Sequence, residues 1–282
     1  MIQDIHPHRF HNEFEPDAVP APEDYVLHFR EDKVLMCRDG ERTAFPKVSD
    51  FPDAKQLIFL LRIDGKGCYL LQEAEQLPQN TQFIRMMEVR EQAPKELAFT
   101  ALTAWQLANW YRNNVFCGRC GAKTVRSGWE RAIVCPKCGN TVYPKIVPAV
   151  IVAVVNGEKL LLTRYANRPY SRYALVAGFT EIGETLEETV AREVMEEVGL
   201  KVRNITYYKS QPWGIVDDLL AGFYCEVDGD DTIRLDRNEL KEGVWLERSE
   251  IPTEYDDYSM TNEMIIRFKE GLDPMSNKKC GI

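Results

Sequence analysis

Residues 178–200 read GFTEIGETLEETVAREVMEEVGL, and the clearest structural prediction for this chain starts from them. Gly178 and Gly183 indicate a loop, and Thr185 followed by Glu188 is typical of a helix N-terminus with a capping box. Apolar side chains then recur on one helical face, at Leu186, Val190, Val194 and Val198. Gly199 fits the position just after a helix, so we expect a helix over residues 187–198.

A second face of the same helix is acidic. Glu193, Glu196 and Glu197 lie three and four positions apart, so their carboxylates project together. Three like charges repel one another, and hard cations such as Mg²⁺ or Mn²⁺, which prefer carboxylate oxygens, would offset that repulsion. A solvated acidic face is the alternative, because such faces are common on helices. The acidic face by itself therefore suggests a metal site and leaves the alternative open.

Four of the eight cysteines form two C-x2-C pairs, Cys117 with Cys120 and Cys135 with Cys138. Each pair bends the chain so that two thiolates reach one ion, and four thiolates complete the tetrahedral shell of zinc. We therefore predict one structural Zn²⁺ per chain, bound by these four cysteines. Such a closed shell leaves no position for a substrate, so this zinc is not expected to be catalytic.

The cysteine-rich segment also suggests a different class of function. Zinc ribbons often bind nucleic acid, and Trp129 in this ribbon could stack on a base. The positive charges of the segment are Arg119, Lys123, Arg126, Arg131 and Lys137. The alternative is that zinc only stabilises a segment too small to hold a core of its own.

The composition limits the classes of function. The net charge of −9 argues against charge-driven binding of nucleic acid over the whole surface and leaves only a local basic patch. An acidic protein also repels a phosphate ester unless a divalent cation intervenes. The longest apolar run, residues 146–155, is about half of the ~20 residues that cross a bilayer, and residues 1–15 lack the pattern of a secretory signal. We expect a cytoplasmic protein without a membrane segment.

Turn signals and apolar patterns predict an N-terminal domain (1–112), the cysteine-rich ribbon (113–143) and a C-terminal domain (144–282). In the N-terminal domain we expect strands at 25–29, 33–36, 56–62 and 67–71 and a helix at 94–113. In the C-terminal domain we expect strands at 148–155, 159–163, 174–177, 205–209, 219–227 and 243–246 and a last helix at 262–270.

The whole pattern of residues 178–200 resembles the signature of the Nudix hydrolases, G-x5-E-x7-R-E-U-x-E-E-x-G-U, in which U is apolar. Every defined position matches: Gly178, Glu184, Arg192, Glu193, Val194, Glu196, Glu197, Gly199 and Leu200. The resemblance implies an α+β protein, in which a Nudix α/β/α sandwich follows a four-cysteine zinc ribbon and an N-terminal α/β domain. It also implies metal-dependent hydrolysis of a nucleoside diphosphate linked to another group.

Features outside the signature resemble the NADH pyrophosphatase branch of that family, which also includes enzymes that remove NAD caps from RNA. They are the ribbon itself, Tyr-Pro-Lys at 143–145, Ala-Gly-Phe at 177–179 and Ser-Gln-Pro-Trp at 210–213. The resemblance implies hydrolysis of NADH or NAD⁺ to AMP and nicotinamide mononucleotide, NAD-capped RNA as a further substrate, and a homodimer. The branch continues after the tryptophan with Pro-Phe-Pro-x-Ser, whereas this chain has Gly-Ile-Val-Asp-Asp at 214–218, which puts the substrate preference in doubt.

The resemblance implies roles for individual residues. More than one Mg²⁺ or Mn²⁺ would be held by Glu193, Glu196, Glu197, Glu239 and the backbone carbonyl of Ala177. Arg192 would orient a carboxylate, Glu184 would support the loop or an outer metal shell, and Glu196 or Glu239 would act as the base. Asp236 and Glu242 are competitors for the role of Glu239. Candidate substrate contacts are Tyr143, Gln211, Pro212, Trp213, Gly214, Ile215, Val216, Asp217 and Asp218, and Arg85 is a candidate for a phosphate or partner-chain contact.

Three functions follow from these observations. The first is hydrolysis of NAD(H), with NAD-capped RNA included. The second is a Nudix hydrolase of another dinucleotide or of a nucleotide sugar, such as ADP-ribose. The third, from another class, is a zinc-ribbon protein that binds nucleic acid. A packed turn with a core tryptophan is the alternative interpretation of Gln211 and Trp213.

Overall fold

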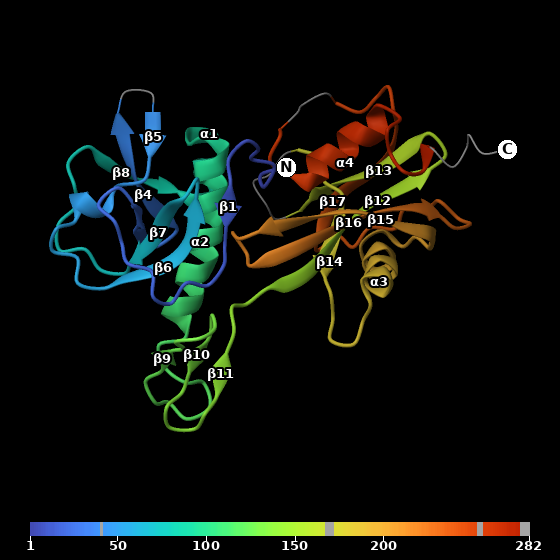
Figure 1. Cartoon of the computed structure of the whole chain (residues 1–282). Coiled ribbons are helices and arrows are strands. Elements are labelled where there is room, and N and C mark those ends of the chain that lie inside the picture. Colours follow the sequence, from blue (N-terminus) through green and yellow to red (C-terminus); the bar gives the residue numbers. More distant parts are fainter. Residues whose placement is uncertain (40–41, 167–171, 253–255, 277–282) are drawn as a thin grey trace. The chain divides into compact units, whose positions relative to one another are not determined.

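The computed structural model describes residues 1–39, 42–166, 172–252 and 256–276, which form two compact units (Figure 1). The first unit contains Met1, Val147–Pro212 and Asp218–Ile282, and the second contains Ile2–Ile146 and Trp213–Asp217. The cysteine-rich ribbon thus falls in the second unit, and the division into three domains stays a prediction. No helix in the described ranges combines the length and the apolar character needed to cross a bilayer.

A mixed sheet forms the centre of the first unit, in the order β15-β16-β12-β13-β17, and β14 pairs with β12. Its strands are β12 (Val147–Asn156), β13 (Lys159–Tyr165), β14 (Val176–Phe179), β15 (Val202–Trp213), β16 (Asp218–Val227) and β17 (Leu240–Glu247). The central strand β12 runs parallel to β16 and antiparallel to β13 and β14. A strand with neighbours on both edges and helices on both faces is apolar throughout, which explains the unbroken apolar run at 149–155.

Alternate residues of β12 face two different helices. Val150, Val152 and Val154 pack with the apolar face of α3 (Leu186–Val198). Ile151, Ala153 and Val155 pack in a second core with α4 (Met260–Lys269). Figure 1 shows α3 and α4 on opposite faces of the sheet, so the predicted α/β/α sandwich is confirmed.

The ends of α3 are as the sequence predicts. The Thr185 hydroxyl accepts a hydrogen bond from the Glu188 amide at 3.2 Å, and the Glu188 carboxylate accepts one from the Thr185 amide at 2.8 Å. Gly199 follows the helix in the left-handed conformation, with φ of 70°. The capping box and the closing glycine therefore define the helix on which the acidic face lies.

Two strand predictions differ from the structure. The strand expected at 174–177 is β14 at Val176–Phe179, so Gly178 lies in a strand that pairs with Val150 instead of in a loop. The strand expected at 205–209 is longer at both ends, since β15 covers Val202–Trp213 and pairs with β16. Both differences arise from pairing with distant segments, which local apolar patterns do not record.

The second unit holds two four-stranded sheets, ordered β1-β6-β7-β2 and β3-β4-β5, with β8 paired to β4. Their strands are β1 (Phe10–His11), β2 (Tyr25–Leu27), β3 (Phe29–Arg30), β4 (Lys33–Asp39), β5 (Arg42–Ala44), β6 (Leu57–Ile63), β7 (Lys66–Leu71) and β8 (Thr81–Arg85). The predicted helix is α2 (Lys95–Asn113), and a shorter helix, α1 (Met86–Gln92), precedes it. The sequence did not predict β1, β5, β8 or α1.

The ribbon adds a three-stranded sheet to the second unit, ordered β11-β10-β9. The strands are short: β9 (Val125–Arg126), β10 (Ile133–Val134) and β11 (Thr141–Val142). Few of its side chains are fully buried, and those that are include Cys117, Ile133 and Cys135. So small a core needs a further source of stability, as expected for a metal-stabilised segment.

Candidate functional site

Arg192 connects the acidic face of α3 to the loop before the helix. Its Nε and Nη2 atoms donate to the two carboxylate oxygens of Glu184, at 2.6 and 2.9 Å. Nη1 donates to Glu193 at 2.7 Å and to Glu196 at 3.0 Å. Nη2 also donates to the backbone carbonyl of Phe179 at 2.9 Å. One guanidinium therefore fixes three carboxylates and the end of β14.

Glu184 is held on the loop side of this arrangement. The Arg192 guanidinium is the main reason why the pKa of Glu184 is about 2, well below its ordinary value. The Glu181 amide donates to the same carboxylate at 3.1 Å, and the Thr189 hydroxyl donates at 3.0 Å. These contacts hold the loop at 181–184 against α3, and the role of Glu184 in the site stays a prediction. The contributions of Thr189 and of the Phe179 carbonyl were not predicted, since no sequence pattern points to either of them.

Glu193 lies in a space that glycine leaves open. A Cβ atom added at Gly178 would fall on the Glu193 carboxylate, so any other residue at 178 would displace it. Burial is the main cause that raises the pKa of Glu193, and the neighbouring carboxylates of Glu196 and Glu239 raise it further. Arg192 acts in the opposite direction without cancelling the rise. The site therefore carries more negative charge than its one arginine balances.

Glu197 and Glu239 extend the acidic site beyond the reach of Arg192. Glu197 is only 3% exposed, which is uncommon for a carboxylate unless a cation or hydrogen-bond donors compensate its burial. The segment after β16 returns to α3, where the Asp236 amide donates to the Glu197 carbonyl at 2.9 Å. This return explains how Glu239, far away in the sequence, comes close enough to affect the pKa of Glu193.

The two competitors of Glu239 are engaged elsewhere. Asp236 accepts hydrogen bonds from the amide and the side chain of Asn238, both at 2.9 Å. Glu242 pairs with Arg164 at 3.4 Å. Within the described ranges the Glu239 carboxylate forms neither an ion pair nor a hydrogen bond, and it is exposed. The structure thus favours Glu239 over its neighbours as a metal ligand, and this role stays a prediction.

The acidic residues do not form a compact cluster. Among the described residues, the only group of three or more potential ligands with donor atoms within 4.8 Å of one another is the four cysteines. Repulsion between the carboxylates opposes such a cluster. The donor set still fits hard divalent cations, because it offers carboxylate oxygens beside the backbone of Ala177 in β14.

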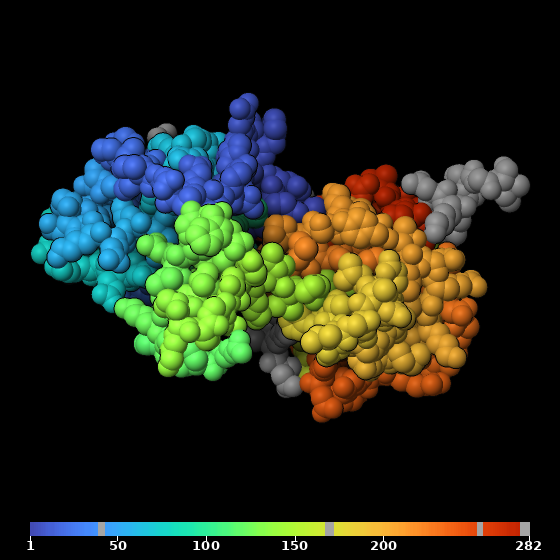
Figure 2. All heavy atoms as spheres, turned by 60° about the horizontal axis from the view of Figure 1, so that its bottom comes forward, coloured from blue at the N-terminus to red at the C-terminus, as the bar shows by residue number. Residues whose placement is uncertain are grey.

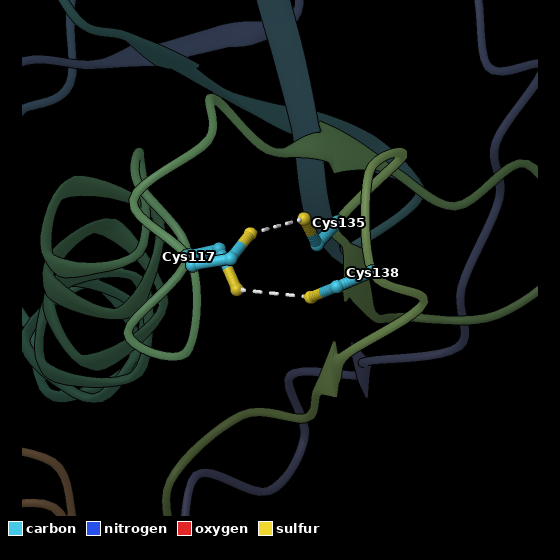
Figure 3. A group of neighbouring side chains, drawn as sticks. Cys117, Cys135 and Cys138 are labelled. Carbon is cyan, nitrogen blue, oxygen red and sulfur yellow. Dashed lines mark hydrogen bonds between the residues drawn. The ribbon is translucent and has the colours of Figure 1, made fainter.

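The four cysteines of the ribbon do form a compact cluster (Figure 3). The sulfur atoms of Cys117 and Cys138 are 3.7 Å apart, and those of Cys120 and Cys135 are 3.5 Å apart. Sulfurs that surround one zinc ion at about 2.3 Å lie about 3.8 Å from each other in a tetrahedron. The predicted zinc site therefore has the size that this ion requires.

The thiols also differ in how readily they lose a proton. The Arg119 amide is the main cause that lowers the pKa of Cys117. Burial raises the pKa of Cys135, but the backbone amides of Cys138 and Lys137 outweigh it and bring the pKa to about 6. Backbone amides that point at sulfur in this way stabilise thiolates, which is the form that binds zinc.

Gln211, a predicted substrate contact, is engaged inside the first unit. It is 1% exposed, and its side-chain amide donates to the carbonyl of Tyr258 at 2.7 Å. Its side-chain oxygen accepts a hydrogen bond from the Met260 amide at 2.8 Å. These bonds join β15 to the start of α4. The structure therefore gives Gln211 a packing role, although it lies on a strand instead of the packed turn considered above.

Residues 213–217 lie in the second unit; they include Trp213 and four of the five residues, 214–218, that depart from the branch pattern. Gly214 is packed so closely against the carbonyl of Leu102 in α2 that a Cβ atom would collide with it. This contact is a physical reason for glycine at 214. Asp217 pairs with Lys145 at 3.5 Å. The other members of this segment are partly buried or exposed: Trp213, Ile215 and Val216.

The remaining candidate substrate contacts are dispersed. Tyr143 donates through its hydroxyl to Glu130 at 3.3 Å, and Arg85 donates to Asp32 at 3.3 Å; all four residues belong to the second unit. In the first unit Pro212 is exposed and Asp218 is buried at the start of β16. Their contacts with a substrate stay predictions.

Two families match this chain. Residues 145–265 match the family described as NUDIX domain, and residues 112–143 match the family described as NADH pyrophosphatase zinc ribbon domain. The two matched ranges follow each other almost without a gap.

Curated relatives of this chain share the name NAD-capped RNA hydrolase NudC. A protein of Pectobacterium atrosepticum named NAD-capped RNA hydrolase NudC is 42% identical over 147 residues, 52% of this chain and 56% of that protein. A protein of the same name from Erwinia tasmaniensis is 37% identical over 188 residues, 67% of this chain and 70% of that protein. The match to the first relative therefore spans little more than half of its length.

Among solved structures, a NUDIX hydrolase from Nitrosomonas europaea is similar over 55% of this chain and 90% of its own, with 25% identity and a TM-score of 0.48.

Proposed function

The chain belongs to the Nudix family, and from this membership and its ribbon we propose that it hydrolyses the pyrophosphate of NADH or NAD⁺ to AMP and nicotinamide mononucleotide. NAD-capped RNA is included as a substrate, since it presents the same pyrophosphate. The observation that carries the proposal is that a zinc ribbon precedes the Nudix domain in one chain. The family that the ribbon matches is described as the zinc ribbon of NADH pyrophosphatases.

The chain's own residues supply a preorganised acidic site. Arg192 fixes Glu193 and Glu196 on α3. It also joins the loop at 181–184 to this helix through its bond to Glu184. Gly178 leaves the space into which the Glu193 carboxylate fits. Glu196 or Glu239 accepts the proton of the attacking water. Two or more bound Mg²⁺ or Mn²⁺ ions would neutralise the phosphate oxygens and make that water more acidic.

Substrate choice is the point at which other Nudix activities compete with this proposal. The residues at 214–218 differ from the NADH pyrophosphatase pattern, and Gln211 is occupied by protein contacts. A nucleotide sugar or another dinucleotide is therefore the second candidate. The third, a nucleic-acid-binding protein without turnover, does not account for the ordered contacts of Arg192.

One substrate panel separates these functions. Turnover is measured with Mg²⁺ and with Mn²⁺ on NADH, NAD⁺, ADP-ribose, a diadenosine polyphosphate and NAD-capped RNA. We expect NADH, NAD⁺ or the capped RNA to be turned over with the highest kcat/KM. Turnover of ADP-ribose with none of NADH or capped RNA would reject the proposal, and RNA binding without any turnover would favour the third function.

A matched pair of variants tests the role of the acidic face. Glu197→Gln removes one buried charge and should abolish turnover, whereas Glu187→Gln removes an exposed charge at the start of α3 and should not. Circular dichroism checks that both variants fold. Near-normal activity of a folded Glu197→Gln protein would reject the assignment of Glu197 to the metal site.

A homodimer in the cytoplasm completes the proposal. The homodimer rests on the resemblance to the NADH pyrophosphatase branch, and the location carries over the expectation stated under the sequence. Light scattering coupled to size-exclusion chromatography measures the mass in solution, for which we expect twice that of the 32.5 kDa chain.

A further inference from the structure

The ribbon exposes aromatic rings at an unusual density. Phe116 is 65% exposed and Trp129 is 83% exposed, and Tyr143 adds a third ring. In the rest of the described chain, Phe179 and Tyr207 are the large aromatic residues with comparable exposure. Exposed rings on so small a segment cost free energy in water, which indicates a partner that covers them. Figure 2 shows the ribbon, in green, at the surface that faces the viewer.

The same segment carries cations that no carboxylate neutralises. Residues 113–143 contain five basic side chains and one acidic side chain, Glu130, to which Tyr143 donates. In the parts of the chain that the structure describes, four of the five basic residues form no ion pair: Arg119, Lys123, Arg126 and Lys137. A local positive surface on a chain with a net charge of −9 indicates a polyanionic partner.

The fifth basic residue, Arg131, points inward and anchors the ribbon. Its guanidinium donates to the carbonyl of Leu60 at 2.8 Å and to that of Asn12 at 2.9 Å. The Leu60 carbonyl is accessible because β6 has an irregularity between Phe59 and Leu61. The ribbon is therefore held on the N-terminal sheet, and its exposed rings and cations stand on a fixed support.

One hairpin combines a ring and two cations. Phe116 and Lys123 face each other across a β-bridge, and the first zinc knuckle, with Arg119 in it, lies between them. The bond from the Cys117 amide to the Ala122 carbonyl, at 2.8 Å, closes the hairpin. Side chains directly opposite on paired strands lie on the same face, so Phe116 and Lys123 project from one face of the hairpin.

We propose that the hairpin at 116–123 binds single-stranded RNA, with a base stacked on Phe116 and backbone phosphates held by Lys123 and Arg119. A stacking surface beside cations is the combination by which proteins hold single strands without reading their sequence. The inference deepens the proposed function and rests on it, because it gives the RNA body of an NAD-capped substrate a binding surface on the ribbon.

Binding is measured apart from turnover. The full chain is titrated into a short fluorescent 5′-hydroxyl single-stranded RNA, without divalent metal, and anisotropy gives the Kd. We expect Phe116→Leu and Lys123→Glu each to weaken binding about tenfold. Lys123→Ala should also reduce the slope of log Kd against log salt by about 0.7, the contribution of one phosphate contact. Lys55→Glu makes the same charge change at an exposed site of the same unit and should alter neither quantity.

The outcomes separate the inference from the proposed function. Suppose that the wild type turns over NADH and that the Phe116 and Lys123 variants bind RNA as tightly as the wild type. The inference is then wrong while the enzyme assignment stands. An equal loss in Lys55→Glu, or binding of an acidic peptide in place of RNA, also overturns it. If RNA binding depends on Phe116 and Lys123 but NADH, NAD⁺ and capped RNA are not hydrolysed, the proposed function fails and the binding surface stands.

Discussion

The Glu193 carboxylate occupies the space that a Cβ atom of residue 178 would need, so Gly178 and Glu193 depend on each other. Gly178 lies in β14 and Glu193 on α3, and the fit joins the strand to the acidic face of the helix. The first glycine of the Nudix signature is therefore required for a steric reason, which is separate from the backbone freedom of glycine. The fit between Gly178 and Glu193 can be tested by substitution, because the methyl group of an alanine at 178 is enough to displace the Glu193 carboxylate.

Gly178→Ala should lower kcat/KM by about 100-fold, because the added methyl group displaces a carboxylate whose position the chemistry requires. Steady-state kinetics on NADH with Mn²⁺ measures the effect. Gly128→Ala is the control, since a Cβ atom there meets nothing within 4 Å, and it should leave the rate unchanged. Wild-type kinetics in Gly178→Ala would show that the Glu193 carboxylate is not needed at this position.

Arg192→Lys should lower kcat/KM by about 10- to 100-fold, which is the usual cost of losing a group that orients metal ligands. A lysine keeps the charge but cannot bond Glu184 through two nitrogens while it also holds Glu193 and Glu196. Arg203→Lys, an exposed residue of the first unit, controls for the substitution itself. Equal rates for the two variants would mean that the charge alone suffices.

Glu239→Gln should raise the Mn²⁺ concentration for half-maximal rate by about tenfold, because it removes one carboxylate from the metal site. Glu242→Gln removes a carboxylate three residues away that pairs with Arg164, and it should leave the metal dependence unchanged. The measurement is a titration of the rate with Mn²⁺. A larger effect in Glu242→Gln would show that the wrong glutamate has been assigned.

The ribbon should contain one zinc ion per chain by elemental analysis. Cys138→Ser removes one of the four thiols, and we expect zinc to be lost and the melting temperature to fall by about 5–10 °C, since structural zinc stabilises small domains directly. Cys37→Ser changes a partly buried thiol outside the ribbon and should retain the zinc. Full zinc content in Cys138→Ser would contradict the four-cysteine site.

Arg131→Lys should lower the free energy of unfolding by about 2 kcal/mol, because a lysine cannot bond two carbonyl groups through a planar fork, and one of them belongs to a buried residue. The carbonyls concerned belong to Leu60 and Asn12, and burial lowers the pKa of Arg131. Urea denaturation gives the free energy, and Arg126→Lys serves as the exposed control in β9. A smaller loss in Arg131→Lys than in Arg126→Lys would show that the anchor does not contribute to stability.

Local features of the sequence were sufficient for part of this description. The capping box, the apolar face and the closing glycine of α3 could be predicted because all of them are encoded within residues 185–199. The structure confirms these three predictions. The cysteine pairs likewise predicted the zinc cluster, because each pair bends the chain over only a few residues. The apolar run at 149–155 indicated a strand, and the structure shows that this strand is buried on both faces.

Other roles were decided only by the tertiary structure. Arg131 has the same sequence character as the exposed cations of the ribbon, yet it points to the Leu60 carbonyl. Gln211 was predicted to contact a nucleotide, and the fold instead places it against Tyr258 and Met260. Glu239 approaches Glu193 only because the chain returns to α3.

Whether a feature could be predicted from the sequence depends on how far apart along the chain the residues that form it lie. Caps, helical faces and C-x2-C pairs are formed by neighbouring residues, so the sequence of this protein determined them by itself. The function of a charged or amide side chain depends on the partner it meets, and distant segments supply the partners of Arg131, Gln211 and Glu239. The packing of strands and helices decides which segments those are.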